Sequence, residues 1–398
     1  MGDRTLLLGL DLGDEKSQLA VYNQEMREPE LVGATEENPE ALYDTVIEME
    51  GIEPLTDFLP RIRRGEEILV DDRASEPVNI LAYYFRRLLA EVRQKYPSET
   101  IRQLVVTVAD PSRSFVELIY ASLEKLGIGK DRAMVIGHKQ SYLYFVLYQK
   151  AELWVNDVGM FDYDGKNLHY YQMQVDRRKK PVPVRVMERD FTDAMIMAGD
   201  ESAPGAVFEN IVYSAIHRQI LSTLYMTGAG FEAEWTDEIF HKLCVGRRLF
   251  KGQNLYVSGA CYAAKELGGT SRLEDYLLMD EDMITFHLSM KVYKDAKMQD
   301  YILAKAGNPW YQIDSTIELV PDGENELNLM ATNIFSQKER HFILDLDPVA
   351  GKTARQCRLA LRVRFSDVNT CIVTIKDRGF GELFPTSNRI WEKTLKIS

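Results

Sequence analysis

The sequence has few cysteines and histidines, and their spacing builds no recognisable site. Its cysteines, Cys244, Cys261, Cys357 and Cys371, include no CxxC pair, the spacing typical of zinc and redox sites. The six histidines form no HExxH motif or similar ligand cluster. We therefore expect reduced thiols and no metal site built from cysteine or histidine.

Long apolar segments and an excess of positive charge are absent as well. No apolar run approaches the ~20 residues of a transmembrane helix, and residues 1–20 lack the basic segment and apolar core of a signal peptide. With 61 acidic against 48 basic residues, the formal charge of -13 repels phosphate backbones and anionic membranes. We expect a cytoplasmic protein with no nucleic-acid or membrane partner.

What is present begins with a hairpin in a chain long enough, at 398 residues, for two or more domains. In Leu6–Tyr22, LLLGLDLGDEKSQLAVY, an apolar run ends in Asp11, a turn follows at Gly13–Lys16, and a second apolar run leads away. An acid on a hydrophobic strand is costly to desolvate unless a cation, water or donor compensates it. Asp11 therefore either holds a hydrated metal under a phosphate or caps the turn.

Strand and helix signals alternate in the next part of the chain. The expected elements in order are a helix from Pro77, the strand Leu104–Val108, a helix over Asp110–Leu126, the strand Ala133–Ile136 and a helix over Ser141–Lys150. This alternation predicts a parallel α/β sheet.

The layout of the first hairpin then returns. Val158–Tyr163 is a strand that carries Asp162, Asp164–Asn167 is a tight polar turn, and Leu168–Val175 is the return strand. Two strand-Asp-turn-strand units about 150 residues apart suggest a duplicated fold. We expect two α/β lobes in residues 1–280, with Asp11 and Asp162 facing each other across a cleft.

Four more elements complete these lobes. We expect helices over Ala206–Thr227 and Thr236–Phe250, and then a strand, Asn254–Val257, that meets a Ser-Gly-Ala turn before a last helix. Small residues such as Gly259 and Ala260 between a strand and a helix let backbone N–H groups approach an anion or nucleotide. Any tight turn of this kind also favours glycine.

From about Ile284 the pattern changes to strands alone. Their expected bounds are His287–Tyr293, Tyr301–Ala306, Trp310–Val320, Leu327–Phe335, His341–Asp347, Cys357–Phe365 and Thr370–Lys376. Apolar and charged residues alternate in these runs, which is the period of half-buried strands. We expect a β-sandwich domain over residues 284–398.

Taken together, these segments resemble the actin-like ATPase superfamily and, within it, the DnaK-type heat-shock chaperones. GLDLGDEKSQLAVY resembles the family's first phosphate loop and keeps Asp11, Gly13 and Ser17. FDYDGKNLHYY, with Asp162 and Gly165, stands where the second phosphate loop belongs. NLYVSGACYAA, which contains Gly259 and Ala260, resembles the adenosine segment. The resemblance implies ATP or ADP as ligand and Mg²⁺ held through water by the two aspartates.

The second half carries the resemblance further. Asp275–Asp280, DYLLMD, resembles the linker that couples the nucleotide and substrate domains, and RLALRVRFSDVNTCIVTIKDRGFGE resembles the last strands of the peptide-binding β-domain. The chain is similar to a reduced, bacterial DnaK-like family without the helical lid. The resemblance implies a protein partner that binds the β-domain. A second interpretation is that Asp275–Asp280 simply ends the last helix of the lobes.

The chain also departs from the family's pattern. Asp14 and Glu15 stand where the family has hydroxyl residues, and a carboxylate within ~4 Å of a triphosphate costs roughly 1 to 4 kcal/mol. The second loop has a single glycine, so it reads equally well as a plain Asp-Gly hairpin. The family's carboxylate near the attacking water falls at Gly137–Lys139, where there is no acid. Hydrolysis needs such preorganised groups, so we expect a slow ATPase at most.

Several functions fit these features. The first is a DnaK-like protein with weak or vestigial ATP binding that acts through protein contacts. The alternative is a scaffold whose pseudo-ATPase core binds no nucleotide, which the altered loops favour. A metabolite kinase would need an aspartate as base, and Asp110 is the candidate, although its Asp-Pro context is typical of a helix cap. The appended β-domain argues against that kinase and against a filament protein.

Overall fold

The computed structural model describes residues 5–51, 53–70, 73–198, 204–269, 271–322, 326–347 and 353–397. The chain divides into an N-terminal unit, Met1–Asp280, and a C-terminal unit, Glu281–Ser398. The first is mixed α/β and the second is built of strands, as the sequence predicts. Within the described residues no helix is both long and apolar enough to cross a membrane.

The first lobe of the N-terminal unit is built on a sheet with the order β3-β2-β1-β7-β8, in which β4 also pairs with β2. Its strands are β1 (Thr5–Leu12), β2 (Lys16–Asn23), β3 (Glu28–Leu31), β4 (Tyr43–Asp44), β7 (Thr100–Val108) and β8 (Ala133–Gly137). β1 runs antiparallel to β2 and parallel to β7. A separate small sheet pairs β5 (Ile68–Val70) with β6 (Arg73–Ser75). β7 and β8, the two strands predicted for this region, run parallel to each other, and the sheet as a whole is mixed.

The second lobe is built on a sheet with the order β13-β12-β9-β10-β11-β14. Its strands are β9 (Asp157–Tyr163), β10 (Leu168–Val175), β11 (Val182–Asp190), β12 (Leu221–Thr227), β13 (Arg248–Lys251) and β14 (Tyr276–Met279). β9 and β10 repeat the antiparallel hairpin of β1 and β2. β14 is the linker-like segment, and it pairs in parallel with β11 at the edge of the sheet. The interpretation that this segment ends the last helix is wrong, because that helix ends at Leu267.

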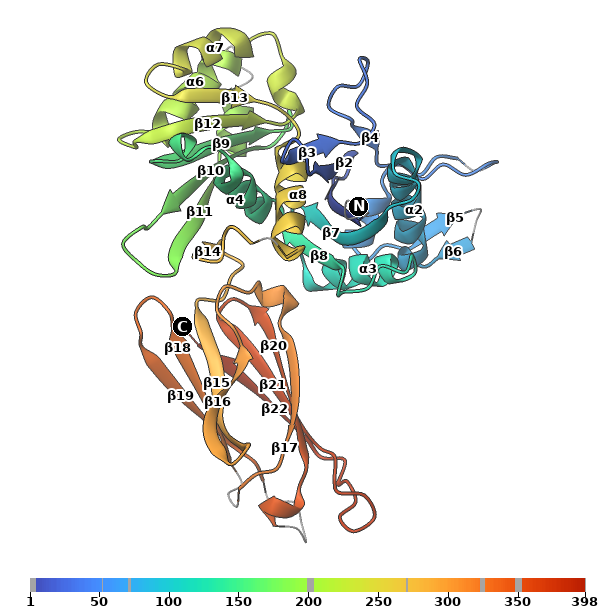
Figure 1. The fold of residues 1–398 in the computed structure, drawn as a ribbon, viewed down its shortest axis with the longest axis vertical. Coiled ribbons are helices and arrows are strands. Elements are labelled where there is room, and N and C mark those ends of the chain that lie inside the picture. The colour runs from blue at the N-terminus through green and yellow to red at the C-terminus, as the bar shows by residue number, and fades with distance from the viewer. Residues whose placement is uncertain are drawn as a thin grey trace. The chain divides into compact units, whose positions relative to one another are not determined.

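Helices cover both sheets. They are α1 (Phe58–Arg63), α2 (Pro77–Lys95), α3 (Arg113–Glu124), α4 (His138–Tyr148), α5 (Thr192–Ala198), α6 (Pro204–Ala215), α7 (Thr236–Leu243) and α8 (Leu255–Leu267), with short 3-10 turns at Ala151–Leu153 and Ala229–Glu232. α6 and α7 pack on one face of the second sheet and α4 on the other. α8 packs on the first sheet, so α4 and α8 lie between the two sheets (Figure 1).

The helix predicted over Ala206–Thr227 is wrong in its second half. α6 ends at Ala215, and Leu221–Thr227 is β12, a central strand between β13 and β9. A strand that is buried on both faces has a continuous apolar sequence without polar alternation. Its apolar residues therefore also fit the spacing expected of a helix. Ile220, which that count placed on the buried face, is 76% exposed.

Two further predictions in this region are wrong. The helix expected to reach Phe250 ends at Leu243, and the segment after it forms the edge strand β13. Asn254–Val257 is not a strand, because Asn254 caps α8 and the helix continues through the Ser-Gly-Ala segment. Gly259 lies in mid-helix, where a Cβ atom would approach the backbone oxygen of Ser141 on α4 to 2.0 Å. The glycine therefore serves the contact between two helices.

The C-terminal unit consists of two antiparallel four-stranded sheets with the orders β16-β15-β18-β19 and β17-β20-β21-β22. Its strands are β15 (Phe286–Lys294), β16 (Lys297–Ala304), β17 (Asp314–Leu319), β18 (Glu326–Asn333), β19 (Glu339–Asp345), β20 (Leu359–Asp367), β21 (Thr370–Asp377) and β22 (Ile390–Lys396). Short 3-10 turns lie at Trp310–Gln312 and Ala354–Gln356. β22 has no counterpart among the seven predicted strands.

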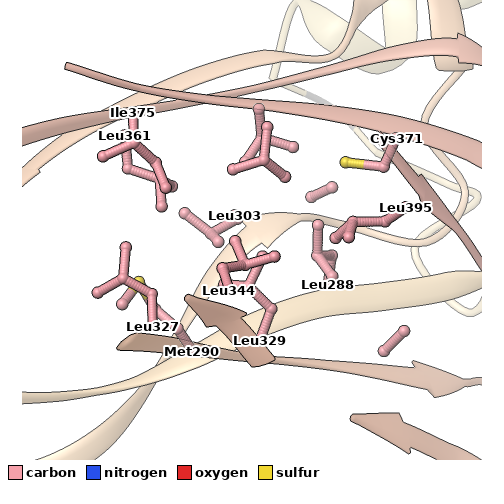
Figure 2. Close-up of a cluster of buried hydrophobic side chains, with 14 of the residues drawn as sticks. Leu288, Met290, Leu303, Leu327, Leu329, Leu344, Leu361, Cys371, Ile375 and Leu395 are labelled. Atoms are coloured by element: carbon pink, nitrogen blue, oxygen red, sulfur yellow. The ribbon is translucent and has the colours of Figure 1, made fainter. Parts of the chain in front are cut away.

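One hydrophobic core joins these two sheets. Figure 2 shows Leu288 and Leu329 from one sheet in the same cluster as Leu361 and Ile375 from the other, and these four side chains are at most 1% exposed. The alternation of apolar and polar residues along each strand supplies one inward face per sheet.

The contact between α4 and α8 yields a test of the packing. Gly259→Ala places a methyl group against the Ser141 backbone, and overpacking of this kind costs about 1–3 kcal/mol of unfolding free energy. Chemical denaturation measures it. Gly205→Ala in α6 is the matched control, because the nearest atom there is the movable Cδ1 of Ile239 at 2.8 Å. Equal stabilities for the two variants would contradict the close contact.

Candidate functional site

The two predicted hairpin tips each carry their aspartate at the end of a strand. Asp11 pairs with Gln18 near the end of β1, and Asp162 pairs with His169 near the end of β9. Both acids stand where an apolar strand passes into a polar turn. The question for function is what compensates the two carboxylates.

The carboxylate of Asp11 is bonded to a histidine of the same chain. Its Oδ1 lies 2.8 Å from Nε2 of His138, and the two side chains are only 14% and 15% exposed. His138 is the first residue of α4, directly after β8. Because β8 and β1 belong to one sheet, the end of β8 brings the imidazole to the tip of the first hairpin.

The carboxylate of Asp162 is bonded to a tyrosine. The hydroxyl of Tyr256 donates to Oδ2 of Asp162 at 2.6 Å, and the tyrosine ring stacks on the ring of His138 with centroids 3.8 Å apart and an angle of 12°. Burial raises the pKa of Asp162 and of the Tyr256 hydroxyl. We call these four residues, Asp11, His138, Tyr256 and Asp162, the tip cluster. It brings the two predicted acids to one site, with two stacked rings between them.

Gly13 and Ser17, predicted to contact a phosphate, support the first hairpin itself. A Cβ atom on Gly13 would lie 2.3 Å from the backbone oxygen of Lys16. The hydroxyl of Ser17 is buried 2.9 Å from that of Thr45, which in turn donates to the backbone oxygen of Gly13 at 2.8 Å. A hydroxyl has one proton, so Ser17 donates to Thr45. Its proton is therefore committed within the protein.

Each charge of the first turn also has a partner in the chain. Asp14 lies 2.9 Å from a guanidinium nitrogen of Arg63, and Lys16 lies 2.5 Å from Asp44. Glu15, at the exposed tip, is 3.9 Å from Nζ of Lys166 in the second turn. Lys16 is thus paired with Asp44 and not with the acids of its own turn.

The second turn is an aspartate-capped hairpin next to a glycine segment that the sequence analysis missed. Oδ1 of Asp164 accepts from two backbone N–H groups at 2.6 Å, and Gly165 has a φ of +99°. A Cβ atom on Gly228 would lie 2.3 Å from the backbone oxygen of Tyr163, and one on Gly230 would lie 2.6 Å from the backbone nitrogen of Gly165. The glycine turn beside this hairpin is thus Gly228–Gly230 after β12. It directly follows Ala206–Thr227, the segment predicted as one helix.

Gly259 and Ala260, the other predicted nucleotide contacts, lie elsewhere. Both are inside α8, and Ala260 is fully buried against the first sheet. Their backbone N–H groups are in a helix interior, where they are bonded to preceding carbonyls. Asp110, the base of the kinase hypothesis, is exposed at a bend, and the cap of α3 is Ser112, whose hydroxyl accepts from the N–H of Phe115.

A second ionic cluster lies beside the tip cluster. Glu188 on β11 accepts from Lys139 at 2.7 Å and lies 2.9 Å from Nδ1 of His169 on β10. The close approach of His169 and the charge of Lys139 lower the pKa of Glu188 to about 2, and the neighbouring Glu188 carboxylate raises the pKa of His169. Glu188 therefore joins α4 to the second sheet through two charged partners.

The two carboxylates of the tip cluster are already engaged by side chains of the chain. Among the described residues, no three histidine, cysteine or acidic side chains are grouped to hold a metal ion. Mg²⁺ prefers carboxylate, carbonyl, water and phosphate oxygens. Asp11 and Asp162 meet that preference, but each already has a carboxylate oxygen bonded to a ring of the cluster. Bound Mg²⁺ would have to displace those rings or reach the free oxygens through water.

Comparisons with known families now place the chain. The model of the C-terminal part of a family of unknown function, DUF5716, matches residues 39–281, more than half of the chain. The protein belongs to the DUF5716 family. In this DUF5716 protein, a domain of unknown function, DUF8552, matches residues 283–397. A search of curated proteins found no match. In the sequence, the first match ends at residue 281 and the second begins at residue 283, close to the division between the two units after Asp280.

The Glu188 cluster predicts a pH-dependent contribution to stability. A raised folded pKa at His169 gives stability that is complete below the ordinary value of 6.5 and is lost as pH rises through the folded pKa. The lowered pKa of Glu188 gives stability that is complete above the ordinary value of 4.5 and is lost as pH falls towards about 2. The stabilisation that the His169–Glu188 pair gives the folded state should therefore be largest between pH 4.5 and pH 6.5, the ordinary pKa values of the two groups.

The measurement is denaturation of the wild type and of His169→Gln at about pH 5.5, below the ordinary pKa of histidine, and at about pH 8.5, well above it. We expect the variant's loss of unfolding free energy to be larger at the lower pH. NMR titration of His169 should also show its pKa fall when Glu188 is changed to Gln. His341→Gln is the control, because that histidine is exposed in the C-terminal unit. A loss that is equal at both pH values would contradict the pairing.

Proposed function

We propose that the protein acts through protein contacts made by its C-terminal unit, and that its N-terminal unit is an actin-like, DnaK-like core that does not turn over nucleotide. The observation that carries the proposal is a large groove in the C-terminal unit. The groove has a volume of about 1270 Å³ and is lined mainly by residues of β15, β16, β17 and β18, together with His341 of β19 and residues outside the strands such as Val320. Pockets for small ligands typically measure about 300–1,000 Å³, so this one suits a longer occupant.

The walls of the groove suit an extended peptide. Buried apolar side chains such as Leu327 and Leu329 line its floor, and partly exposed ones stand among its lining residues: Met298 at 64%, Val320 at 48% and Tyr301 at 37%. β16 and β17 stand at the ends of their sheets in the strand order. An edge strand offers backbone groups for pairing, while side-chain pockets select alternate residues of the added segment.

The tip cluster supports the second part of the proposal. Both aspartates that would serve Mg²⁺ and phosphate are bonded to rings of the same chain. The segment Gly137–Lys139, where the resemblance places the family's acid near the attacking water, instead contributes the His138 imidazole that Asp11 engages. Asp14 and Glu15 add negative charge to the first turn. A core of this kind favours a scaffold role over an ATPase.

Weak binding of ATP or ADP with Mg²⁺ is the second candidate. It is favoured by the close contact between the glycine turn Gly228–Gly230 and the second hairpin. Glycine has no side chain, so the backbone of such a turn can approach a phosphate closely. β14 would then transmit the state of the lobes, because it is an edge strand of four residues joined to β11 by pairing. In that case nucleotide would have to move the His138 and Tyr256 rings.

Peptide binding tests the first part. We expect the full chain to bind a subset of an array of apolar-containing decapeptides, and the double variant Met298→Asp, Val320→Asp to bind them at least tenfold more weakly, about 1.4 kcal/mol. The control is Ile343→Asp, which adds a charge at a 62% exposed position on β19 outside the groove. Undiminished binding by the groove variant would refute the proposed site.

A thermal shift assay separates the two candidates for the core. A ligand at 100 times its dissociation constant adds about 2.7 kcal/mol of stability, which raises Tm by several degrees in a domain of this size. We expect no shift with millimolar Mg-ATP or Mg-ADP. A shift that is lost in Asp11→Asn would establish nucleotide binding instead, and steady-state ATP turnover abolished by the same change would show an active enzyme.

A further inference from the structure

Each of the two helices between the lobes, α4 and α8, follows a strand of one sheet and packs on the other sheet. α4 leaves the first sheet after β8 and packs on the second sheet, whereas α8 follows β13 of the second sheet and packs on the first. His138 is the first residue of α4 and Tyr256 is the second residue of α8. Each ring of the stacked pair therefore stands at the start of one of these two helices.

The tip cluster makes a continuous connection through these starting points. It runs from Asp11 on the first sheet to His138, through the ring stack to Tyr256, and on to Asp162 on the second sheet, with contacts at 2.8, 3.8 and 2.6 Å. Separation of the two hairpin tips would break at least one of these contacts.

A second tie lies one turn further along α4. The hydroxyl of Ser141 donates to that of Thr107 on β7 of the first sheet at 2.7 Å, with both residues buried. The backbone of Ser141 also touches α8 at Gly259, where no room remains even for a methyl group. α4 is thereby bonded to the first sheet while its apolar face is packed on the second.

We infer that the stacked pair His138 and Tyr256, with the two aspartates it engages, is an internal clamp that holds the two lobes in one arrangement without a bound ligand. Two-lobed proteins commonly close around a ligand that supplies the contacts between the lobes. Here side chains of the protein supply them. The inference does not depend on the peptide groove of the C-terminal unit.

Pulsed electron resonance distances between the lobes test the clamp in the full chain. One spin label is attached to the exposed Cys244 of the second lobe and another to Arg86→Cys on α2, while Cys261, Cys357 and Cys371 are buried. We expect one narrow distance distribution that Mg-ATP leaves unchanged. The double variant His138→Ala, Tyr256→Phe should broaden or shift that distribution. A broad wild-type distribution that narrows with Mg-ATP, or an unchanged distribution in the folded double variant, overturns the clamp.

Hydrogen exchange keeps the test decisive if the double variant does not fold. Tyr256→Phe keeps the ring stack but removes the hydroxyl that donates to Asp162, so the amides of residues 13–17 and 164–167 should exchange at least tenfold faster. Tyr83→Phe is the control, because it removes a hydroxyl that donates to the backbone oxygen of Glu48 at 2.9 Å within the first lobe. Unchanged exchange at both tips in Tyr256→Phe would refute the clamp.

Discussion

Two carboxylates at the ends of apolar strands are the constraint on which the N-terminal unit depends. A buried acid must be neutralised, hydrated or bonded, and this chain bonds both with its own rings, Asp11 to His138 and Asp162 to Tyr256. Because those rings stack on each other, compensation of one acid is tied to compensation of the other. The need to compensate one buried carboxylate in each hairpin is thus met by contacts that connect the two sheets.

That connection gives the surrounding residues their roles. α4 and α8 must start beside the tips for the rings to meet, and the close approach of their backbones at Ser141 and Gly259 permits this. Glu188 holds the second residue of α4, Lys139, against the second sheet. In the first turn, the guanidinium of Arg63 pairs with the carboxylate of Asp14, which would otherwise be an unpaired charge. The charged side chains of this turn thus contact other residues of the chain.

The hairpins and the change to an all-strand unit could be predicted because their signals are local: an apolar run, a polar turn and a second run. Asp11 and Asp162 followed from the same pattern. β12 could not be distinguished from a helix, since a central strand buried on both faces has no period of two. The error at β12 concealed the strand that Gly228–Gly230 follows, and the one at Asn254–Val257 misassigned Gly259. The partners His138 and Tyr256 lie 127 and 94 residues from the acids they engage, and no local pattern signals such a pairing.

The two units therefore differ in where unsatisfied binding capacity remains. At the hairpin tips both aspartates have a bonded carboxylate oxygen, and the rings that bond them stack on each other. In the C-terminal unit, β16 and β17 end their sheets beside a groove whose exposed apolar side chains, Met298 and Val320, lie in contact with solvent. Apolar surface in water favours association roughly in proportion to the area it removes. The proposed peptide site therefore lies where apolar surface is exposed to water, and the proposed clamp lies where the acids of the core already have partners.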